Sequence, residues 1–169
     1  MKVGLMADTH DNLIATSALL KLMAERDVGM ILHAGDFCAP FALRPFGEAN
    51  IPLAGVYGRN DGDREGLRAA AAACVGIELY ESPHSLEIGG HRILLVHDIG
   101  EVHQRSLAAH HYVVHGCVHQ VEMKERGESL LINPGEACGW VYGSPTAAIL
   151  DLQSKAVEIL KLDSPLASP

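Results

Sequence analysis

Long hydrophobic runs and closely paired cysteines are both missing from this sequence. The longest nearly apolar stretch, residues 69–76, is far shorter than the roughly 18 residues that a membrane-spanning helix needs. The apolar run at residues 3–7 stops at Asp8, before the hydrophobic region of a signal peptide could form. The four cysteines include no Cys-x-x-Cys pair, which is typical of reduced thiols rather than of a disulfide framework or a zinc finger. We therefore expect a cytoplasmic protein without membrane contact.

Positive charge is scarce as well. The chain has 13 Lys and Arg residues against 21 Asp and Glu residues, which gives a formal net charge of −8. Binding along a nucleic-acid backbone needs clustered Lys and Arg, so we expect no broad nucleic-acid surface, and any bound phosphate must be held locally. Histidine, in contrast, is abundant at ten residues, and it serves both as a metal ligand and as a general acid or base.

The length of 169 residues fits one domain, which we place at residues 1–162, followed by a frayed tail at residues 163–169. Buried strands and helices alternate in the first half. Strands are predicted at residues 2–7, 30–32 and 53–57, and helices at residues 13–23, capped by Asp11 or Asn12, and at residues 64–74. Pro40 and Pro45 predict a short helical or irregular segment between the second and third strands.

The second half of the chain is dominated by predicted hairpins. They pair residues 85–88 with 92–96 across Gly89-Gly90, residues 121–124 with 129–132, and residues 147–152 with 156–160. A helix at residues 101–110 and a strand at residues 112–114 separate the first two hairpins. The whole pattern predicts an α/β fold with a mixed or double sheet.

Polar clusters follow five of the predicted strands. They are Asp8-Thr9-His10, Gly35-Asp36, Gly58-Arg59-Asn60-Asp61, His97-Asp98 and His115-Gly116-Cys117-Val118-His119. Ligand sites in open α/β sheets lie at the carboxyl ends of the strands, so clusters that are far apart in the sequence can meet there.

Four of these residues form a candidate metal site. Asp8 and His10 are two residues apart, so in an extended chain their side chains project to the same side. Asp36 adds a second carboxylate and His119 adds a second imidazole. This mixed set of oxygen and nitrogen ligands suits Mn²⁺, Fe²⁺, Zn²⁺ or Mg²⁺ better than a thiolate-rich structural zinc site does. The pattern therefore predicts a catalytic divalent ion.

Each element of this pattern also has an ordinary structural explanation. Asp8 or Asp11 could cap a helix, a lone Gly-Asp pair is most often a turn, and His97 could be a satisfied core histidine. The combination of the clusters, each after a predicted strand, favours the metal site. His33 and His115 adjoin it and are candidate partners of the ligands. The remaining histidines are expected on the surface: His84, His91, His103, His110 and His111.

The clusters, taken in order, resemble the motifs of the calcineurin-like metallophosphoesterases. The matching elements are Asp8-x-His10, Gly35-Asp36, Gly58-x-x-Asp61, His97 and Gly116-x-x-His119, followed by Asn133-Pro134-Gly135. The chain is most similar to the small prokaryotic phosphodiesterase branch, which also contains the eukaryotic retromer subunit. This resemblance covers residues 1–160. It implies a four-layer α/β/β/α sandwich of two mixed sheets flanked by helices, with the metal site at the C-terminal ends of the strands.

The resemblance also implies two metal positions. The first would use Asp8, His10, Asp36 and His119. The second would use Asp36 as a bridge, His97, an Asn directly after Gly58 and a His directly after Gly116. At those last two positions this chain has Arg59, with Asn60 one residue later, and Cys117.

Three outcomes are open for the second metal position. Cys117 and Asn60 could still bind an ion together with His97. The guanidinium of Arg59 could instead replace the ion and bind a phosphate oxygen, or the site could be decayed. We favour the replacement by Arg59, because a guanidinium beside a divalent ion is repelled.

These features predict a metal-dependent hydrolase of a small phosphate ester, with phosphodiesters preferred. Its first metal site is complete and its second is degenerate. The candidate catalytic residues are His97, Arg59 and Asn60; Arg59 binds the phosphate, and His97 or His115 protonates the leaving group. We expect one or two divalent ions per chain, with Mn²⁺ favoured over Ni²⁺, Fe²⁺ or Zn²⁺. The alternative is a catalytically impaired, metal-binding scaffold for protein interactions on the same fold, and a homo-oligomer is compatible with either function.

Overall fold

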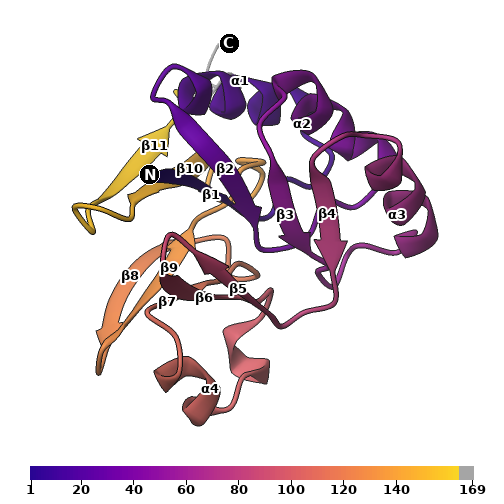
Figure 1. The fold of residues 1–169 in the computed structure, drawn as a ribbon. Helices are drawn as coiled ribbons and strands as arrows, with labels where there is room; N and C mark the ends of the chain where they lie inside the picture. Colours follow the sequence, from indigo (N-terminus) through magenta and orange to yellow (C-terminus); the bar gives the residue numbers. More distant parts are fainter. Residues whose placement is uncertain (164–169) are drawn as a thin grey trace.

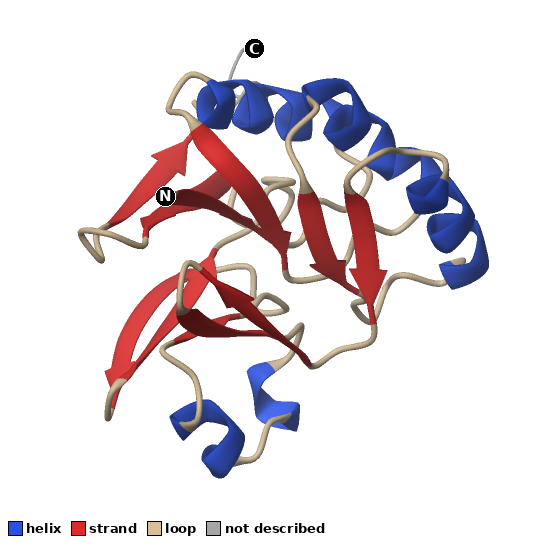
Figure 2. Ribbon diagram, in the orientation of Figure 1, coloured by secondary structure: helices blue, strands red, loops and turns tan. Residues whose placement is uncertain are grey.

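The computed structural model describes residues 1–163, so the predicted tail lies outside the described residues apart from Asp163. Two β-sheets pack against each other, and helices cover the outer face of each sheet (Figures 1 and 2). The predicted four-layer α/β/β/α arrangement is therefore confirmed. None of the helices within residues 1–163 is long and apolar enough to cross a membrane.

The first sheet has six strands in the order β11-β10-β1-β2-β3-β4. Strands β1 to β4 are parallel to one another, whereas β10 and β11 pair antiparallel. Parallel strands covered on both faces are apolar throughout, and residues 3–6 of β1 are accordingly all buried. The strands are β1 (Lys2–Met6), β2 (Val28–His33), β3 (Leu53–Val56), β4 (Ile77–Tyr80), β10 (Thr146–Asp151) and β11 (Val157–Lys161).

The second sheet has five strands in the order β5-β6-β7-β9-β8. The predicted hairpins β5/β6 and β8/β9 are antiparallel, while β6, β7 and β9 run parallel. The strands are β5 (His84–Ile88), β6 (His91–Leu95), β7 (Tyr112–Val114), β8 (Val121–Arg126) and β9 (Ser129–Pro134).

Helices α1 (Leu13–Ala24), α2 (Arg44–Ala49) and α3 (Arg64–Ala72), with the 3₁₀ turn η1 (Pro40–Leu43), lie on the six-stranded sheet. Asn12 caps α1, because its side chain accepts a 3.1 Å hydrogen bond from the Ala15 amide, as predicted. The turn η2 (Ile99–Glu101) and α4 (Gln104–Ala108) lie on the other sheet. Three buried apolar clusters fill the three interfaces between these four layers.

Two sequence predictions are wrong in this region. Strand β4 was not predicted, although it extends the parallel part of the first sheet. Residues 101–110 were predicted as one helix, but they form the end of η2 and the short helix α4. Val102 and His103 between them are extended, and the His103 side chain caps α4 by accepting a hydrogen bond from the Arg105 amide. Only Leu107 of α4 is buried, so this segment has little apolar surface to support a longer helix.

Candidate metal centre

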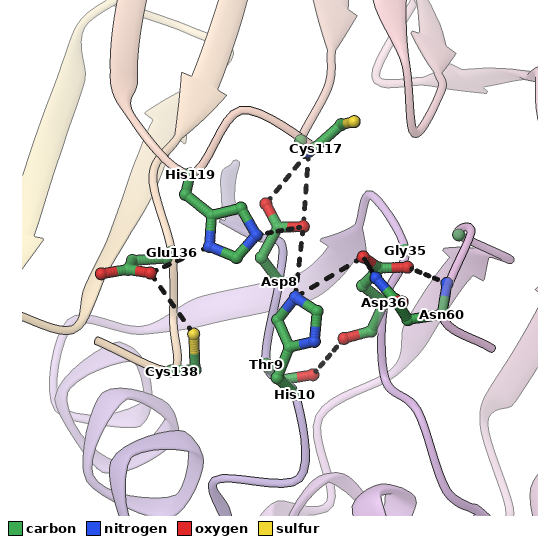
Figure 3. Close-up of polar contacts among 12 residues, drawn as sticks. Asp8, Thr9, His10, Gly35, Asp36, Asn60, Cys117, His119, Glu136 and Cys138 are labelled. Carbon is green, nitrogen blue, oxygen red and sulfur yellow. Dashed lines mark hydrogen bonds and ion pairs between the residues drawn. The ribbon is translucent and has the colours of Figure 1, made fainter. Parts of the chain in front are cut away.

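The candidate ligands gather where strands of both sheets end. Asp36 and the residues around it come from the six-stranded sheet, and His119 comes from the five-stranded sheet (Figure 3). Each ligand lies within a few residues of a strand end: Asp8 and His10 follow β1, Asp36 follows β2, Asn60 follows β3, His97 follows β6, and His119 follows β7. The convergence expected from the strand-end clusters is thus present.

The backbone of these loops is unusually strained. Non-glycine residues rarely adopt a positive φ, and such conformations concentrate at functional sites. Here they turn the chain sharply after each strand, so that the ligands face one another. The φ values are 52° for Asp8, 37° for His10, 59° for Asp11, 63° for Asp36, 81° for Cys38, 72° for Cys117 and 63° for His119.

Two motif glycines allow the backbone to pass close to the carboxylates. A Cβ atom at Gly116 would lie 3.0 Å from Asp8 Oδ2 and 2.8 Å from the Cβ atom of Ala7. A Cβ atom at Gly58 would overlap Oδ1 of Asp36. Only glycine fits such contacts, which gives the Gly-x-x-Asp and Gly-x-x-His motifs a physical basis in this chain.

Three of the four residues of the predicted first site, Asp8, His10 and His119, have ligand atoms within 4.8 Å of one another, and Asp36 lies beside His10. Asp8 and Asp36 are 0% and 2% exposed. The Nε2 atom of His10 is 3.5 Å from Asp36 Oδ2 and 4.0 Å from Asp8 Oδ1. The Nε2 atom of His119 is 3.8 Å from Asp8 Oδ1, and its ring stacks on that of His10 with the centroids 5.0 Å apart.

The imidazoles of this site present their Nε2 atoms to the carboxylates. The Nδ1 atom of His119 donates a 2.9 Å hydrogen bond to Glu136, which leaves Nε2 free to bind an ion. The Nδ1 atom of His10 lies 3.2 Å from the Cys38 sulfur. The Nε2 atom of His10 is buried and has no hydrogen-bond partner within residues 1–163. An unpartnered buried nitrogen beside two carboxylates is what a metal ligand requires.

The electrostatics also fit a cation. Burial raises the pKa of Asp8 to about 6, although His119 and His97 partly oppose this rise. Burial lowers the pKa of His10, which keeps its imidazole neutral. Within residues 1–163, the ion pairs of Asp8 and Asp36 involve only histidines. Two buried carboxylates without an arginine or lysine need another positive charge, and a divalent ion supplies it.

His97 and Asn60 approach Asp36 as well. His97 Nε2 is 3.4 Å from Asp36 Oδ2, while its Nδ1 atom donates a 2.8 Å hydrogen bond to the Ala34 carbonyl. Asn60 donates to the same carboxylate from its backbone amide and from its side-chain amide, both at 2.8 Å. Asp8, Asp36 and His97 form a second group whose ligand atoms lie within 4.8 Å of one another.

Arg59 and Cys117 lie at the edge of this second group. The Nη2 atom of Arg59 pairs with Asp98 and, at 3.4 Å, with Glu101. The Cys117 amide donates to the Asp8 carboxylate at 3.1 Å, but its side chain points away from that carboxylate (Figure 3). Burial raises the pKa of the Cys117 thiol, which makes loss of its proton in the absence of an ion less favourable. Among the groups of closely spaced ligand atoms in residues 1–163, none contains Cys117.

His33 contacts residues next to the candidate ligands rather than the ligands themselves. Its Nδ1 atom accepts a 3.1 Å hydrogen bond from the Gly35 amide, and Nε2 donates to the Thr9 hydroxyl at 3.2 Å. Burial lowers the pKa of His33 well below its usual range, so it remains neutral. His115, in contrast, lies 3.6 Å from Glu122. Of the histidines expected on the surface, two are exposed, His103 and His111. The other three are half-buried: His84, His91 and His110.

Three residues around the site were not identified from the sequence. Glu136 binds His119, and Cys38 contacts His10. Asp61 lies in a predicted cluster without an assigned role, and its carboxylate accepts hydrogen bonds from the amides of Asp36, Cys38 and Gly58. The position of Glu136 directly after Asn133-Pro134-Gly135, at the end of β9, was the available signal.

Comparisons with known proteins agree with this geometry. Residues 1–155 match the family model described as the calcineurin-like phosphoesterase superfamily domain. A phosphodiesterase of Methanocaldococcus jannaschii is 29% identical over 170 residues, which cover 96% of this chain and 100% of that protein. A probable metallophosphoesterase of Methanothermobacter thermautotrophicus is 28% identical over 180 residues, which cover 98% of this chain and 95% of that protein.

Solved structures share the fold. A structure described as a novel archaeal phosphodiesterase is 31% identical with a TM-score of 0.85, and the match covers 96% of this chain and 100% of that chain. A variant of Vps29 from Entamoeba histolytica is 18% identical with a TM-score of 0.68 over 96% of this chain and 99% of that chain. At the lower identity the similarity shows the fold alone.

Proposed function

The chain belongs to the calcineurin-like phosphoesterase superfamily, and from its site we propose that it is a phosphodiesterase with a divalent ion on Asp8, His10, Asp36 and His119. The observation that carries this proposal is the unpartnered Nε2 atom of His10, buried between the carboxylates of Asp8 and Asp36. A purely structural metal site is closed and usually rich in thiolates, whereas this set mixes two carboxylates with two imidazoles at the ends of the strands.

The proposed chemistry divides between the ion and the side chains. A bound divalent ion supplies an acidified water and neutralises charge on a phosphoryl oxygen. Asp8 and Asp36 would hold the cation by their charge, and their burial reduces the solvent screening of this attraction. Glu136 fixes the His119 ring through the Nδ1 hydrogen bond.

A second, weaker ion position is supported by Asp36, Asn60 and His97. Asn60 already contacts Asp36, although it lies one residue later than the family pattern implies. Rotation of its amide would present the oxygen instead of the nitrogen. One ligand of the family pattern is missing from this position. The family has an imidazole directly after Gly116, and this chain has the thiol of Cys117, whose pKa is raised by burial. We therefore expect one tightly bound ion and one weakly bound ion per chain.

Arg59 is the proposed phosphate-binding residue at the rim of the site. Only its Nη2 atom is engaged by Asp98 and Glu101, so Nη1 and Nε remain available to donate to a phosphoryl oxygen. The two carboxylates also offset the charge of the guanidinium. Arg59 therefore does not have to replace the second ion, and both could act on one substrate. A pocket of about 250 Å³ lies beside Arg59 and His97.

His97 is the proposed acid for the leaving group when the second position is empty. Its Nδ1 proton is engaged by Ala34, so the transferable proton would be carried by Nε2, which is 3.4 Å from the Asp36 carboxylate. His115 is a poorer candidate because its Nε2 atom lies beside Glu122, whereas that of His97 lies beside the candidate metal ligand Asp36. Esters with good leaving groups should depend less on this proton.

The mixed carboxylate and imidazole ligands are compatible with several ions, and we favour Mn²⁺, with Ni²⁺, Fe²⁺ or Zn²⁺ as alternatives. The experiment is hydrolysis of bis(p-nitrophenyl) phosphate by metal-stripped protein after addition of each ion. Asp36→Asn should reduce kcat/KM at least about a hundredfold, because it removes a charged ligand.

Asp27→Asn is the matched control. Asp27 is exposed and has φ 58°, close to the 63° of Asp36, so the same substitution is made in the same backbone conformation outside the site. Its activity should stay close to that of the wild type. Absence of turnover with every ion would refute the proposed phosphodiesterase activity and favour the metal-binding scaffold for protein interactions.

A further inference from the structure

An aromatic side chain is fixed beside the metal centre with much of its surface exposed. Trp140 is the only tryptophan of the chain, and it is 54% exposed. Val118, which precedes the ligand His119, and Tyr142 are each 55% exposed. A tryptophan side chain offers a large apolar face with a polar N–H at its edge, which suits it to a binding surface. The proposed metal chemistry uses none of these three side chains.

Contacts at both ends hold Trp140 in place. Its indole Nε1 donates a 3.2 Å hydrogen bond to the carbonyl of His10. The following backbone amides, those of Val141 and Tyr142, donate to the carboxylate of Glu136, which also binds His119. The ring is therefore tied to the backbone of one predicted metal ligand and, through Glu136, to the side chain of another. A ring that is already ordered loses little entropy when it binds a ligand.

Charge gives little help in holding the organic part of a substrate. The chain carries a net charge of −8, and Arg59 is already paired with Asp98 and Glu101. Apolar contact is then the available source of affinity for the group attached to the phosphate. An indole face provides such contact best for a flat aromatic ring.

We propose that Trp140 is a stacking surface for an aromatic substituent of the phosphate ester, either an aryl group or a nucleobase. The inference rests on the proposed function, because the phosphoryl group must sit at the ion held by Asp8, His10, Asp36 and His119. It deepens that function by naming the substrate class: phosphate esters that carry an aromatic ring, in preference to simple alkyl esters.

Binding can be followed directly in the wild-type protein. Because Trp140 is the only tryptophan, excitation near the red edge of tryptophan absorption reports on this ring alone. Phenyl phosphate and methyl phosphate are titrated separately into the Zn²⁺-loaded protein. Phenyl phosphate should change the fluorescence saturably and bind about tenfold tighter than methyl phosphate, which is typical of one aromatic stacking contact.

Variants separate stacking from the hydrogen bond to His10. Trp140→Phe retains an aromatic face but lacks the indole N–H, whereas Trp140→Leu lacks both. Calorimetric titration of the Zn²⁺-loaded proteins should give a phenyl-over-methyl preference that persists in Trp140→Phe and disappears in Trp140→Leu. Phe41→Leu is the control, since Phe41 is an equally exposed aromatic residue that lines a different pocket, beside α2 and α3. Its preference should equal that of the wild type.

Several results would overturn the proposal. One is equal affinity for the two ligands in the wild type, and another is an equal loss of preference in Trp140→Phe and Trp140→Leu, which would assign the residue to positioning His10. A third is a wild-type dimer that Trp140→Leu converts to monomer with no change in preference, because the surface would then join two copies of the chain. Binding is measured without turnover, so an inactive protein with a phenyl preference would refute only the proposed hydrolysis.

Discussion

The Nδ1 atom of His119 and the Oε2 atom of Glu136 are 2.9 Å apart, and this hydrogen bond connects the metal centre to the loop after β9. Burial acts to raise the pKa of Glu136, but hydrogen bonds from the Tyr142 amide, His119 and the Val141 amide outweigh it and lower that pKa. The carboxylate is therefore charged at neutral pH. A charged acceptor fixes the tautomer of His119 and makes its Nε2 atom a better ligand.

Glu136→Gln should weaken metal binding about 10- to 100-fold, because the amide can still accept the hydrogen bond but no longer carries a charge. Calorimetric titration of the stripped protein with Zn²⁺ measures this affinity. Glu128→Gln makes the same change at an exposed position and should bind as the wild type does. Equal affinities in all three proteins would show that Glu136 does not support the ligand.

Removal of the metal should destabilise the protein. Asp8 and Asp36 are buried and lack a lysine or arginine partner among the described residues, so the ion is their main source of positive charge. Free metal at about 1,000 times Kd should add about 4 kcal/mol, or roughly 10 °C in Tm for a domain of this size. Thermal unfolding with a chelator and with added Mn²⁺ gives the two values. A Tm that is the same in both conditions would contradict an ion bound at the buried carboxylates.

Metal affinity should depend on pH through Asp8. Burial raises the pKa of this carboxyl to about 6, so below that pH a proton competes with the ion. Burial lowers the pKa of His10, so protonation of its imidazole competes less with the ion. Between pH 6 and 5 the apparent affinity should fall about fivefold, and above pH 6 the contribution of Asp8 should level off. Titrations from pH 5 to 8 test this. An affinity that keeps rising steeply from pH 6 to 8 would assign the competing proton to another group.

Cys117→His should strengthen the second ion position. An imidazole can bind an ion without losing a proton at pH 7, whereas a thiol must lose its proton to bind, and burial raises the pKa of the Cys117 thiol. Histidine also tolerates the positive φ of 72° at this position better than most residues. Binding of the second equivalent of metal should tighten at least about tenfold. Cys74→His, outside the site, is the control, and an unchanged second equivalent in Cys117→His would show that residue 117 does not limit this position.

The sequence predicted that the candidate ligands of the first metal site lie near one another, because each follows a strand whose end is visible in the local pattern. Asp8, His10, Asp36 and His119 could therefore be placed together without tertiary information. The position of Asn60 was harder to predict. The family pattern has its ligand Asn at the position where this chain has Arg59. In the loop after β3, the Arg59 side chain instead pairs with Asp98 and Glu101, and the Asn60 side chain donates a hydrogen bond to Asp36.

The missed features depend on contacts between distant segments. Strand β4 is short, and only Ile77 among its four residues is fully buried, so its local pattern is weak and its pairing with β3 defines it. Glu136 looks like an ordinary loop residue until the loop after β7 brings His119 to it. Helix α4 was overextended because the sequence does not show that Val102 and His103 are extended.

The most direct test of the metal-dependent phosphodiesterase is a stoichiometric titration of turnover. Metal-free protein receives increasing Mn²⁺, and hydrolysis of bis(p-nitrophenyl) phosphate is measured together with bound metal. Turnover should be absent at the start, appear as the tight position on Asp8, His10, Asp36 and His119 fills, and increase further as the weak position fills. Full turnover by the metal-free protein, or none at any metal content, would contradict the account.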